Sequence, residues 1–514
     1  MRKVPTAPFA PLPLLFLEAP QESELFTFLH EAHQLVAECP EILDSIDADL
    51  DLHGQRKKAL RILDEQWVVA KTKSLPAIEP MANVVAAESL VLGTGRPRTN
   101  ACVVYLFLAG RGFFGGGFKS ADATTLLLES MSLRLFLANQ GMLLPGRSTL
   151  TELVNAVSVE TREKILDAQL REVLKENWDD CKTLTQDSTA VKGNVLWPTD
   201  SRLMGDLVGR LWRRGCKLDL VGLPNFDEPQ IAKVLGKISL MNREISLGAG
   251  PKKAHKRRCL YKNLLKMGKQ AVELLTPQLD LTTQALRDLD VLPSIRARAV
   301  RLVEWMQTDL ENLRRVIQCC EARILRDEKV PVEKKVLSVS DPDVGFIAKG
   351  GREPVVGYKP QLARSGNGFI TGLIVPQGNA SDSCQLLPMF EQVTTRTGVI
   401  PEIVSVDDGY SSTSGRATLL ENGVKIVSIS GSKGKKITPD EDWDTEAYAV
   451  ARDNRSAVES LMFTIKNGFD FGRVARRGLE NVRTELLEKV IAYNFCRLAA
   501  CRRSKAFLIE AQAA

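Results

Sequence analysis

A chain of 514 residues is longer than one ordinary hydrophobic core, which predicts two or three domains. Hydrophobic residues make up 44% and charged residues 26%, which is typical of a folded globular protein and excludes a largely disordered one. The formal net charge of +6 permits a polyanionic partner, so the distribution of the cations along the chain matters more than their sum.

Cysteine and histidine usage excludes several kinds of site. The 10 cysteines include no CxxC pair, so we expect reduced cysteines in a cytoplasmic protein, without a structural zinc site or a disulfide framework. No segment resembles a signal peptide or a membrane span. All four histidines lie in the first half of the chain: His30, His33, His53 and His255. A histidine-based catalytic triad or metal site within the second half is therefore excluded, and carboxylates are the catalytic groups expected there.

Residues 1–180 carry mainly helical patterns and are expected to form an all-helical N-terminal domain. Ser23–Cys39 and Ala123–Asn139 have apolar residues at helical spacing. Thr149 and Glu152 have the spacing of a capping box that begins a further helix after a short turn. Helix, turn and capped helix are compatible with a DNA-binding helix-turn-helix, and a plain helical bundle is the alternative.

A strand rich in threonine and valine is predicted at Lys182–Val195, and a long helical segment follows at Ser201–Asp327. The helical segment contains a basic cluster without any acidic residue: Lys252, Lys253, Lys256, Arg257, Arg258, Lys262, Lys266 and Lys269. A solvated helix face normally mixes both signs of charge. The basic cluster therefore favours contact with nucleic-acid phosphates, and a merely soluble basic surface is the alternative.

From Val336 onwards the pattern changes to strands, with a hairpin turn at Asn367-Gly368. The predicted strands are Val336–Ser340, Val355–Ala363, Phe369–Val375, Glu402–Val406 and Val424–Ser428. The other predicted elements are a helix at Ser383–Thr397, a basic loop at Gly431–Lys436, and helices at Asn454–Asn467 and Thr484–Cys501. We therefore expect an α/β fold, with a mixed sheet flanked by helices and a helical insertion after the first strand. This order of elements resembles a ribonuclease-H-like core.

These patterns divide the chain into three expected parts. Residues 1–180 form a mostly helical DNA-binding domain. Residues 181–200 and 330–514 form the α/β domain, which would be catalytic. Residues 201–329 form the helical insertion that carries the basic cluster.

Three acidic residues occupy positions suited to metal-dependent chemistry. Asp187 ends the first strand and Asp407 ends a later one, and ligands bind at strand ends in open α/β sheets. An aspartate at a strand end is, taken alone, more typical of a turn or a helix cap. Arg455, Glu459 and Lys466 project within about 60° of one another on a helix face. Glu459 thus lies between two cations that could bind phosphates, which favours a role in metal-dependent chemistry. The alternative interpretation is a surface Arg–Glu ion pair without such a role.

The order of these segments resembles the Asp-Asp-Glu (DDE) transposases of bacterial insertion sequences. The resemblance covers most of residues 90–500 and rests on these segments: Ser132–Leu150, Asp187–Ser201, Asp341-Pro342-Asp343, Gly357–Gln361, Gly378–Asp382 and Asp407-Asp408-Gly409-Tyr410. Arg455, Glu459 and Lys466 match three positions of the family's Tyr-Arg-Glu-Lys signature, and Arg452 stands where the family has tyrosine. The helical insertion is a second difference, because the best-known relatives carry an insertion later, before the glutamate.

The resemblance implies a DNA transposase in which Asp187, Asp407 and Glu459 hold two Mg²⁺ ions, or Mn²⁺ in their place, with no other cofactor. It implies hydrolysis of DNA strands at element ends and transfer of the 3′-hydroxyl ends to target DNA, while Arg455 and Lys466 hold phosphates. The expected partners are double-stranded DNA and a second copy in a homodimer, in the cytoplasm at the nucleoid and without a membrane. A catalytically silent, transposase-derived DNA-binding protein and a nuclease of the same fold without joining activity are the alternatives. Asp341 and Asp343 are reserve candidates for the metal site.

Overall fold

The computed structural model describes residues 23–72, 99–114, 120–219, 223, 228–248, 254–348 and 353–513. It divides into two compact units, each with its own core. The sheet unit comprises Met1–Asp51, Arg96–Asn194 and Ile347–Ala514, and the helical unit comprises Leu52–Gly95 and Val195–Phe346. Within the described ranges, no helix is long and apolar enough to cross a membrane.

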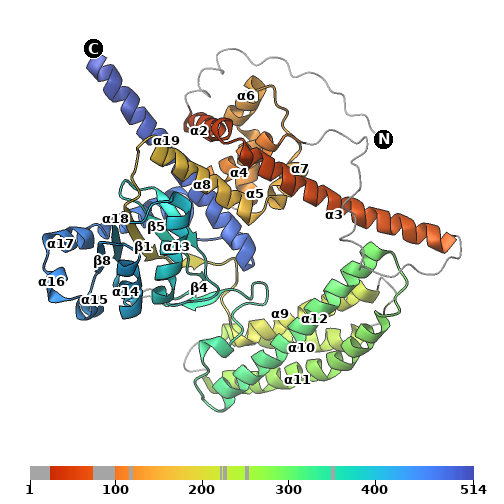
Figure 1. Cartoon of the computed structure of the whole chain (residues 1–514). Coiled ribbons are helices and arrows are strands. Elements are labelled where there is room, and N and C mark those ends of the chain that lie inside the picture. The colour runs from red at the N-terminus through yellow and green to blue at the C-terminus, as the bar shows by residue number, and fades with distance from the viewer. Residues whose placement is uncertain are drawn as a thin grey trace. The chain divides into compact units, whose positions relative to one another are not determined.

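The first part of the chain is helical (Figure 1), with α2 (Glu24–Glu38), α3 (Glu41–Thr72), α4 (Ala101–Phe113), α5 (Ser120–Glu129), α6 (Met131–Asn139), α7 (Arg147–Ala156) and α8 (Val159–Lys175). The helix predicted at Ala123–Asn139 is in fact two helices, because Ser130 separates them and its hydroxyl accepts a hydrogen bond from the Leu133 N–H of α6. The predicted capping box at Thr149 is wrong. Helix α7 begins at Arg147, after Gly146, without a side-chain cap.

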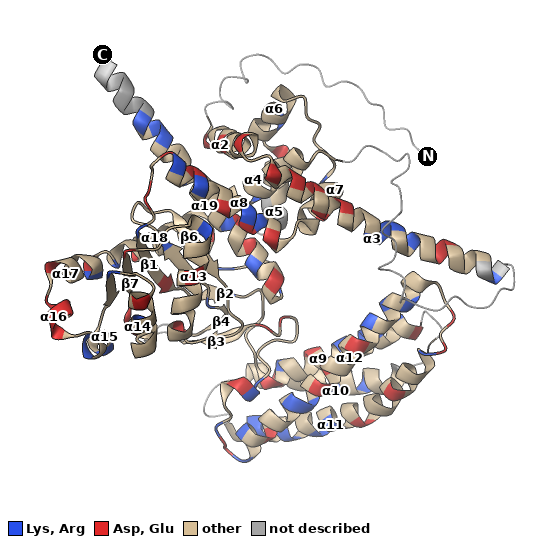
Figure 2. Ribbon diagram, in the orientation of Figure 1, with Lys and Arg blue, Asp and Glu red and all other residues tan. Residues whose placement is uncertain are grey.

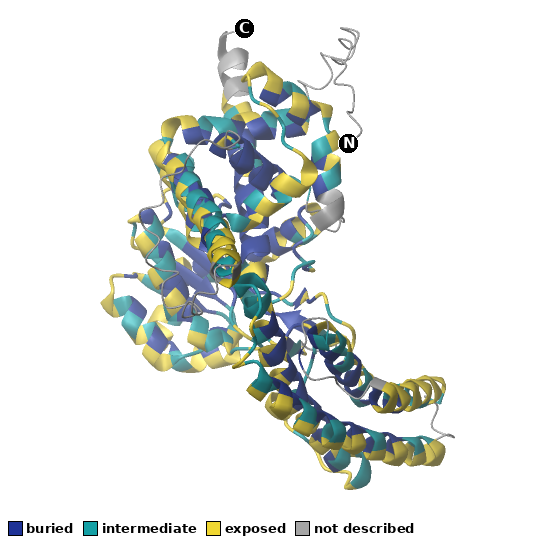
Figure 3. Ribbon diagram, turned by 90° about the vertical axis from the view of Figure 1, so that its right-hand side faces the viewer, coloured by how far each residue is buried: buried dark blue, intermediate teal, exposed yellow. Residues whose placement is uncertain are grey.

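Helix α4 lies at the centre of these helices, and each of its residues from Ala101 to Gly112 is buried. A helix that is apolar all round is stable in water only inside a protein. On one side it packs against the long C-terminal helix α19 (Leu479–Ala513), so closely that a Cβ on Gly112 would lie 2.3 Å from the backbone oxygen of Glu488. Figure 3 shows the buried residues on the sides of these helices that face one another.

The carboxylate of Glu488 is buried where these helices meet. Glu488 of α19 accepts hydrogen bonds from Arg111 of α4 at 2.9 Å and from Arg162 of α8 at 2.9 Å. The guanidinium group of Arg476 lies 3.5 Å from the same carboxylate, and Arg162 also donates to the Val154 oxygen of α7 at 2.8 Å. Burial raises the pKa of Glu488, but the three arginines outweigh this effect and hold the pKa at about 2. The charged cluster therefore joins four helices.

The sheet unit contains a mixed five-stranded sheet in the order β6-β5-β1-β7-β8. Its strands are β1 (Thr183–Ser188), β5 (Gln361–Arg364), β6 (Ile370–Ile374), β7 (Ile403–Val406) and β8 (Ile426–Ile429). Strand β5 is antiparallel to both of its neighbours, whereas β1, β7 and β8 are parallel to one another. The α/β class and the mixed sheet flanked by helices are as the sequence predicted.

Two strand predictions need correction. Val336–Ser340 forms no strand. Val355–Ala363 forms two strands that belong to different sheets, with Lys359-Pro360 between them, where proline has no N–H to donate to a neighbouring strand. The first, β4 (Val355–Tyr358), lies between β2 (Val191–Lys192) and β3 (Gly345–Ile347) in a small sheet, and the second is β5.

The predicted hairpin is confirmed, since β5 and β6 are antiparallel partners joined by the Asn367-Gly368 turn. Gly368 has a φ of +93°, which is open to glycine and strained for other residues.

At each outer edge of the five-stranded sheet, a side chain forms hydrogen bonds with the backbone of the edge strand. Asn494 accepts from the Ile370 N–H of β6 at 3.0 Å and donates to its oxygen at 2.9 Å. The Tyr448 hydroxyl accepts from the Ile429 N–H of β8 at 3.0 Å.

Helices cover both faces of the sheet. On one face, α13 (Leu386–Thr397) and α14 (Thr413–Glu421) pack on an apolar core that includes Leu184, Val404 and Val427. The other face carries α17 (Glu446–Asp453), α18 (Ser456–Gly468) and α19. The basic segment predicted as a loop is a short helix, α15 (Ser432–Ile437), and α16 (Asp440–Trp443) follows it.

The helical unit is built from α9 (Asp200–Asp219), α10 (Glu228–Leu247), α11 (Ala254–Ala285) and α12 (Pro293–Cys320), which share one apolar core. These helices occupy the segment predicted as helical. Asp309 of α12 is buried and pairs with Arg214 of α9 at 2.5 Å, which adds a charged contact to the apolar packing.

We predict that Glu488→Gln lowers the free energy of unfolding by about 3–5 kcal/mol, because three arginines lose their buried counter-charge. The measurement is chemical denaturation at neutral pH, with the exposed Glu480→Gln in the same helix as a control of small effect. Since the folded pKa of about 2 lies below the unfolded value, the carboxylate stabilises the fold above pH about 4.3, and this contribution is lost as the pH falls toward 2. A difference between parent and variant that did not shrink over this range would contradict the assignment.

Candidate active site

The strand register aligns Asp187 with Asp407. Strands β1 and β7 are parallel neighbours, with Thr185 opposite Ser405. Asp407 continues β7 in extended backbone, at φ −87° and ψ 177°, so the same register places it opposite Asp187. Neighbouring strands lie about 4.8 Å apart, and alternate residues share a face. The two carboxylates therefore start from neighbouring positions on one face of the sheet.

This face is the one that α17 and α18 cover. Ser405, which shares the face with Asp407, donates to the Ala451 oxygen of α17 at 2.7 Å. Helix α18 contacts β1. Val404 and Val406 point the other way, into the core beneath α13. Glu459 thus belongs to a helix on the aspartates' side of the sheet.

Glu459 itself is exposed and paired. Its carboxylate accepts a hydrogen bond from Arg455 at 3.1 Å, and 63% of its side-chain surface is open to solvent. Nη1 of Arg455 lies 3.5 Å from the hydroxyl of Ser430, whose N–H donates to the Val406 oxygen at 3.0 Å. The Arg–Glu pair is therefore linked through Ser430 to the residue that precedes Asp407.

These residues suit a hard divalent cation in the type of their donors, because Mg²⁺ prefers carboxylate oxygens. Asp187 accepts from the N–H of Ser188 at 2.7 Å, and Asp407 from the N–H of Gly409 at 2.9 Å, which fixes both carboxylates close to the strand ends. Among the described residues, no three Asp, Glu, His or Cys side chains form a group that could hold a metal ion. The two aspartates are brought together, whereas Glu459 is engaged with Arg455.

Another carboxylate, Asp382, lies beside Asp407. A Cβ on Gly409 would lie 3.0 Å from Oδ1 of Asp407 and 3.2 Å from Oδ2 of Asp382. Lys359 and Gln361 each donate to Asp382 at 2.8 Å. Burial raises the pKa of Asp382, but these two donors outweigh it and leave the pKa below its usual value.

The sequence pattern alone does not assign an individual role to Asp382 or Lys359. The two residues are far apart in the chain, and no periodic pattern connects them. The local signals were a lysine inside a largely apolar segment predicted as a strand, and the presence of both residues in segments that carry the family resemblance, Gly357–Gln361 and Gly378–Asp382. A buried lysine needs a partner, but its identity depends on the fold.

Tyr410 lies near the carboxylates of Asp382, Asp187 and Asp407. Its hydroxyl is buried and donates to the side-chain oxygen of Gln361. Burial raises the pKa of Tyr410, and the nearby Asp382, Asp187 and Asp407 raise it further. The hydroxyl therefore stays protonated at neutral pH and acts as a hydrogen-bond donor rather than a base.

Asp408 has a different, structural role. Its carboxylate accepts hydrogen bonds from the N–H groups of Lys433 and Gly434, both at 2.8 Å, at the start of α15. Gly431 approaches so closely that a Cβ there would lie 2.7 Å from Cγ of Asp408. Of the two adjacent aspartates, Asp407 is therefore the one available to the site.

The other sequence-predicted residues have surroundings of their own. Arg452, at the position of the signature tyrosine, stacks over Trp443 at 5.2 Å. Lys466 lies on α18 and is half-buried. The reserve candidates Asp341 and Asp343 belong to the helical unit, and Asp341 is fully buried.

The basic cluster is only partly described. Lys252 and Lys253 lie outside the described residues. Figure 2 shows cations along α11, where Lys256, Lys262 and Lys266 are exposed. The other three have partners: Arg257 donates to the Gly248 oxygen, Arg258 pairs with Asp327 at 3.4 Å, and Lys269 pairs with Glu321 at 2.5 Å. Three cations of the cluster are thus the best placed to meet a polyanion.

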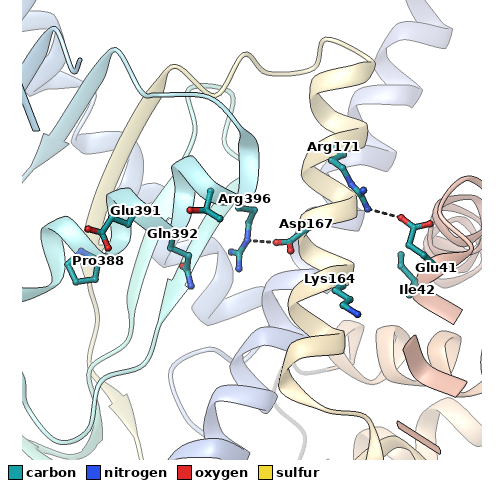
Figure 4. A pocket seen from close by; sticks show the side chains of 10 residues that line it. Glu41, Ile42, Lys164, Asp167, Arg171, Pro388, Glu391, Gln392 and Arg396 are labelled. Atoms are coloured by element: carbon teal, nitrogen blue, oxygen red, sulfur yellow. Dashed lines mark hydrogen bonds and ion pairs between the residues drawn. The ribbon is translucent and has the colours of Figure 1, made fainter. Parts of the chain in front are cut away.

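A cavity of about 720 Å³ in the sheet unit is a competing candidate site. Figure 4 shows that α3, α8 and α13 line it with charged side chains. Its arginines are already neutralised, since Arg171 pairs with Glu41 at 2.9 Å and Arg396 pairs with Asp167 at 2.6 Å. These pairs join three helices, and we assign the cavity a structural role.

Comparison with known proteins identifies one segment. Residues 330–495 match the family described as "Transposase DDE domain". The matched segment includes Asp382, Asp407 and Glu459, whereas Asp187 lies before it. No curated protein and no solved structure matches the chain.

We predict that Lys359→Met lowers the free energy of unfolding by about 3–5 kcal/mol, because it leaves Asp382 buried without its counter-charge. The double variant Lys359→Met, Asp382→Leu should be clearly more stable than Lys359→Met, since both charges are then removed. The measurement is chemical denaturation. Lys425→Met, which breaks an exposed ion pair with Glu402, is the control, with a change below about 1 kcal/mol. Additive effects of the two substitutions would show that the pair is not energetically coupled.

Proposed function

We propose that the protein is an insertion-sequence DNA transposase, on the premise that residues 330–495 match the family described as "Transposase DDE domain". In the proposed reaction it hydrolyses DNA strands at element ends and transfers the 3′-hydroxyl ends to target DNA. The observation that carries the proposal is the register that aligns Asp187 with Asp407 on the sheet face covered by α17 and α18. Glu459 is the third proposed carboxylate, on α18.

The order of elements supports a ribonuclease-H-like core. Strands β1, β5 and β6 are followed by α13, then by β7 and β8, and then by the final helices. The sequence pattern predicts the same order of elements, which resembles such a core. The helices between β2 and β3 would then be an insertion after the first strand of that core.

Two Mg²⁺ ions held by Asp187, Asp407 and Glu459 would activate the attacking oxygen and stabilise the leaving oxygen of an in-line displacement at phosphorus. The protein supplies the geometry. The sheet fixes the two aspartates, while Arg455 and Lys466, on the helix of Glu459, would hold DNA phosphates as fixed positive charges.

The remaining parts of the chain would bind DNA. We assign recognition of element ends to the helices of residues 1–180, around the exposed Thr149 of α7, and non-specific affinity to the basic cluster. A homodimer would hold the two ends of the element. The Arg455–Glu459 pair favours a second candidate, a catalytically silent DNA-binding protein, because a surface ion pair accounts for both residues without a metal.

Our third prediction separates catalysis from binding. Glu459→Gln preserves volume and hydrogen bonding but removes a negative charge that Mg²⁺ needs. The variant should bind element ends at least as tightly as the parent and should lose metal-dependent nicking and joining. A gel-shift titration and a cleavage assay on the same labelled end fragment, with Mg²⁺ present, measure both properties.

Lys466→Ala is the matched control on the same helix face, because it should weaken DNA binding while leaving the carboxylates intact. Cleavage by Glu459→Gln at the parental rate would remove Glu459 from the site. Absence of cleavage by the parent itself would favour the silent DNA-binding protein. Cleavage without strand transfer would favour a nuclease of the same fold.

Our fourth prediction concerns the basic cluster. Replacing Lys256, Lys262 and Lys266 by alanine should reduce the salt dependence of DNA binding by about 0.9 in log–log slope per lost phosphate contact. The matched control replaces three exposed cations of the neighbouring helix α10: Lys233, Lys237 and Arg243. Fluorescence anisotropy over a salt series gives both slopes. Equal slopes for the two triple variants would show that the cluster does not contact DNA preferentially.

A further inference from the structure

A second cavity, of about 460 Å³, lies between the β5–β6 hairpin, α18 and α19. Its polar lining comes from all three elements: Arg364 from the hairpin, Ser460 and Thr464 from α18, and Tyr493 and Arg497 from α19. None of these residues belongs to the carboxylate site or to the family signature. The cavity therefore needs an explanation of its own.

Two arginines face each other at this cavity. A Cβ on Gly368 would lie 3.4 Å from Nη2 of Arg364 and 3.4 Å from Nη2 of Arg497. Within the described part of the chain, neither guanidinium group forms an ion pair with a carboxylate. Asp179, the nearby acid, is already bonded to the hydroxyl of Ser365 at 2.6 Å.

The hydrogen-bond partners of both guanidinium groups are backbone oxygens, and the charge of Asp179 lies nearby without forming an ion pair with Arg364. Arg364 donates to the backbone oxygen of Ser365 at 3.0 Å, and Arg497 donates to that of Asn367 at 2.6 Å. Burial lowers the pKa of Arg364, and the neighbouring Arg497 lowers it further. Two like charges at short range repel, and an anion between them converts this repulsion into two charge-assisted hydrogen bonds. The chemistry of the cavity thus favours an oxyanion.

The cavity borders the same exposed surface of α18 that carries Glu459. At about 100° per residue, Ser460 and Thr464 lie about 100° and 140° around the helix from Glu459. Phe463 lies between Glu459 and these two residues, at about 40° from Glu459, and is 71% exposed. Exposed aromatic side chains beside cations are typical of surfaces that bind nucleic-acid strands, because bases stack on them.

We propose that Arg364 and Arg497 form an oxyanion site that binds a backbone phosphate of the DNA strand lying across α18. The identity of the occupant rests on the proposed function, whereas the oxyanion site itself does not. A free phosphate offers the same chemistry, so the experiment has one arm for each source.

The DNA arm measures binding of a fluorescently labelled duplex of arbitrary sequence by anisotropy, without divalent metal, over a salt series. Arg364→Gln and Arg497→Gln should each reduce the log–log slope by about 0.9. Arg497→Lys, which keeps the charge, should retain most of the parental slope. Arg171→Gln removes one charge at the other cavity and serves as the charge-matched control, with an unchanged slope. Slopes equal to that of the control for both glutamine variants would overturn the DNA contact.

The phosphate arm measures the Tm of the full chain in sodium phosphate and in sodium chloride of equal ionic strength. Phosphate should raise the Tm of the parent and of Arg171→Gln more than that of the double variant Arg364→Gln, Arg497→Gln. Equal increases in all three proteins would overturn the oxyanion site. A response in this arm with no response in the DNA arm would overturn DNA as the occupant. A parent that bound no DNA at all would contradict the proposed function, and the phosphate arm would still decide the site.

Discussion

The buried carboxylate of Glu488 is the constraint on which the arrangement of the sheet unit depends. A charge inside a protein is tolerated only when paired, and here the partners come from segments more than 300 residues away, Arg111 and Arg162. Pairing Glu488 with these two arginines requires α4 and α8 to pack against α19. Because Asn494 of α19 bonds the edge strand β6, the same requirement also sets where the sheet lies against the N-terminal helices.

The aspartates around the candidate site show how one residue type takes different roles according to its partners. Asp408 accepts hydrogen bonds from two backbone N–H groups at the start of α15. Asp382 is neutralised by a buried lysine. Asp187 and Asp407 accept hydrogen bonds from neighbouring backbone N–H groups, and the strand register places them opposite each other at neighbouring strand ends. The proposed reaction is assigned to these two because they share one face of the sheet.

Local patterns in the sequence were sufficient for some of these features. Asp187 and Asp407 each follow a short strand, and Asn367-Gly368 specifies a tight turn, so their positions could be predicted from neighbouring residues alone. The division of Val355–Ala363 between two sheets could not, because its hydrophobic pattern continues through Pro360 and only pairing partners reveal the break. The Lys359–Asp382 pair and the Glu488 cluster join distant segments, which periodicity does not report. The approach of Glu459 to the two aspartates stays a prediction, since its side chain is paired with Arg455.

The side chains at the two outer strands of the main sheet have a consequence for assembly. Exposed strand edges are the usual place where a sheet grows by pairing with another chain. Here the backbone of Ile370 is occupied by Asn494 and that of Ile429 by Tyr448, one at each end of the sheet. A second copy could extend the sheet only after displacing these side chains. Pairing of another strand with either edge of the five-stranded sheet would therefore compete with hydrogen bonds that the chain already makes to itself.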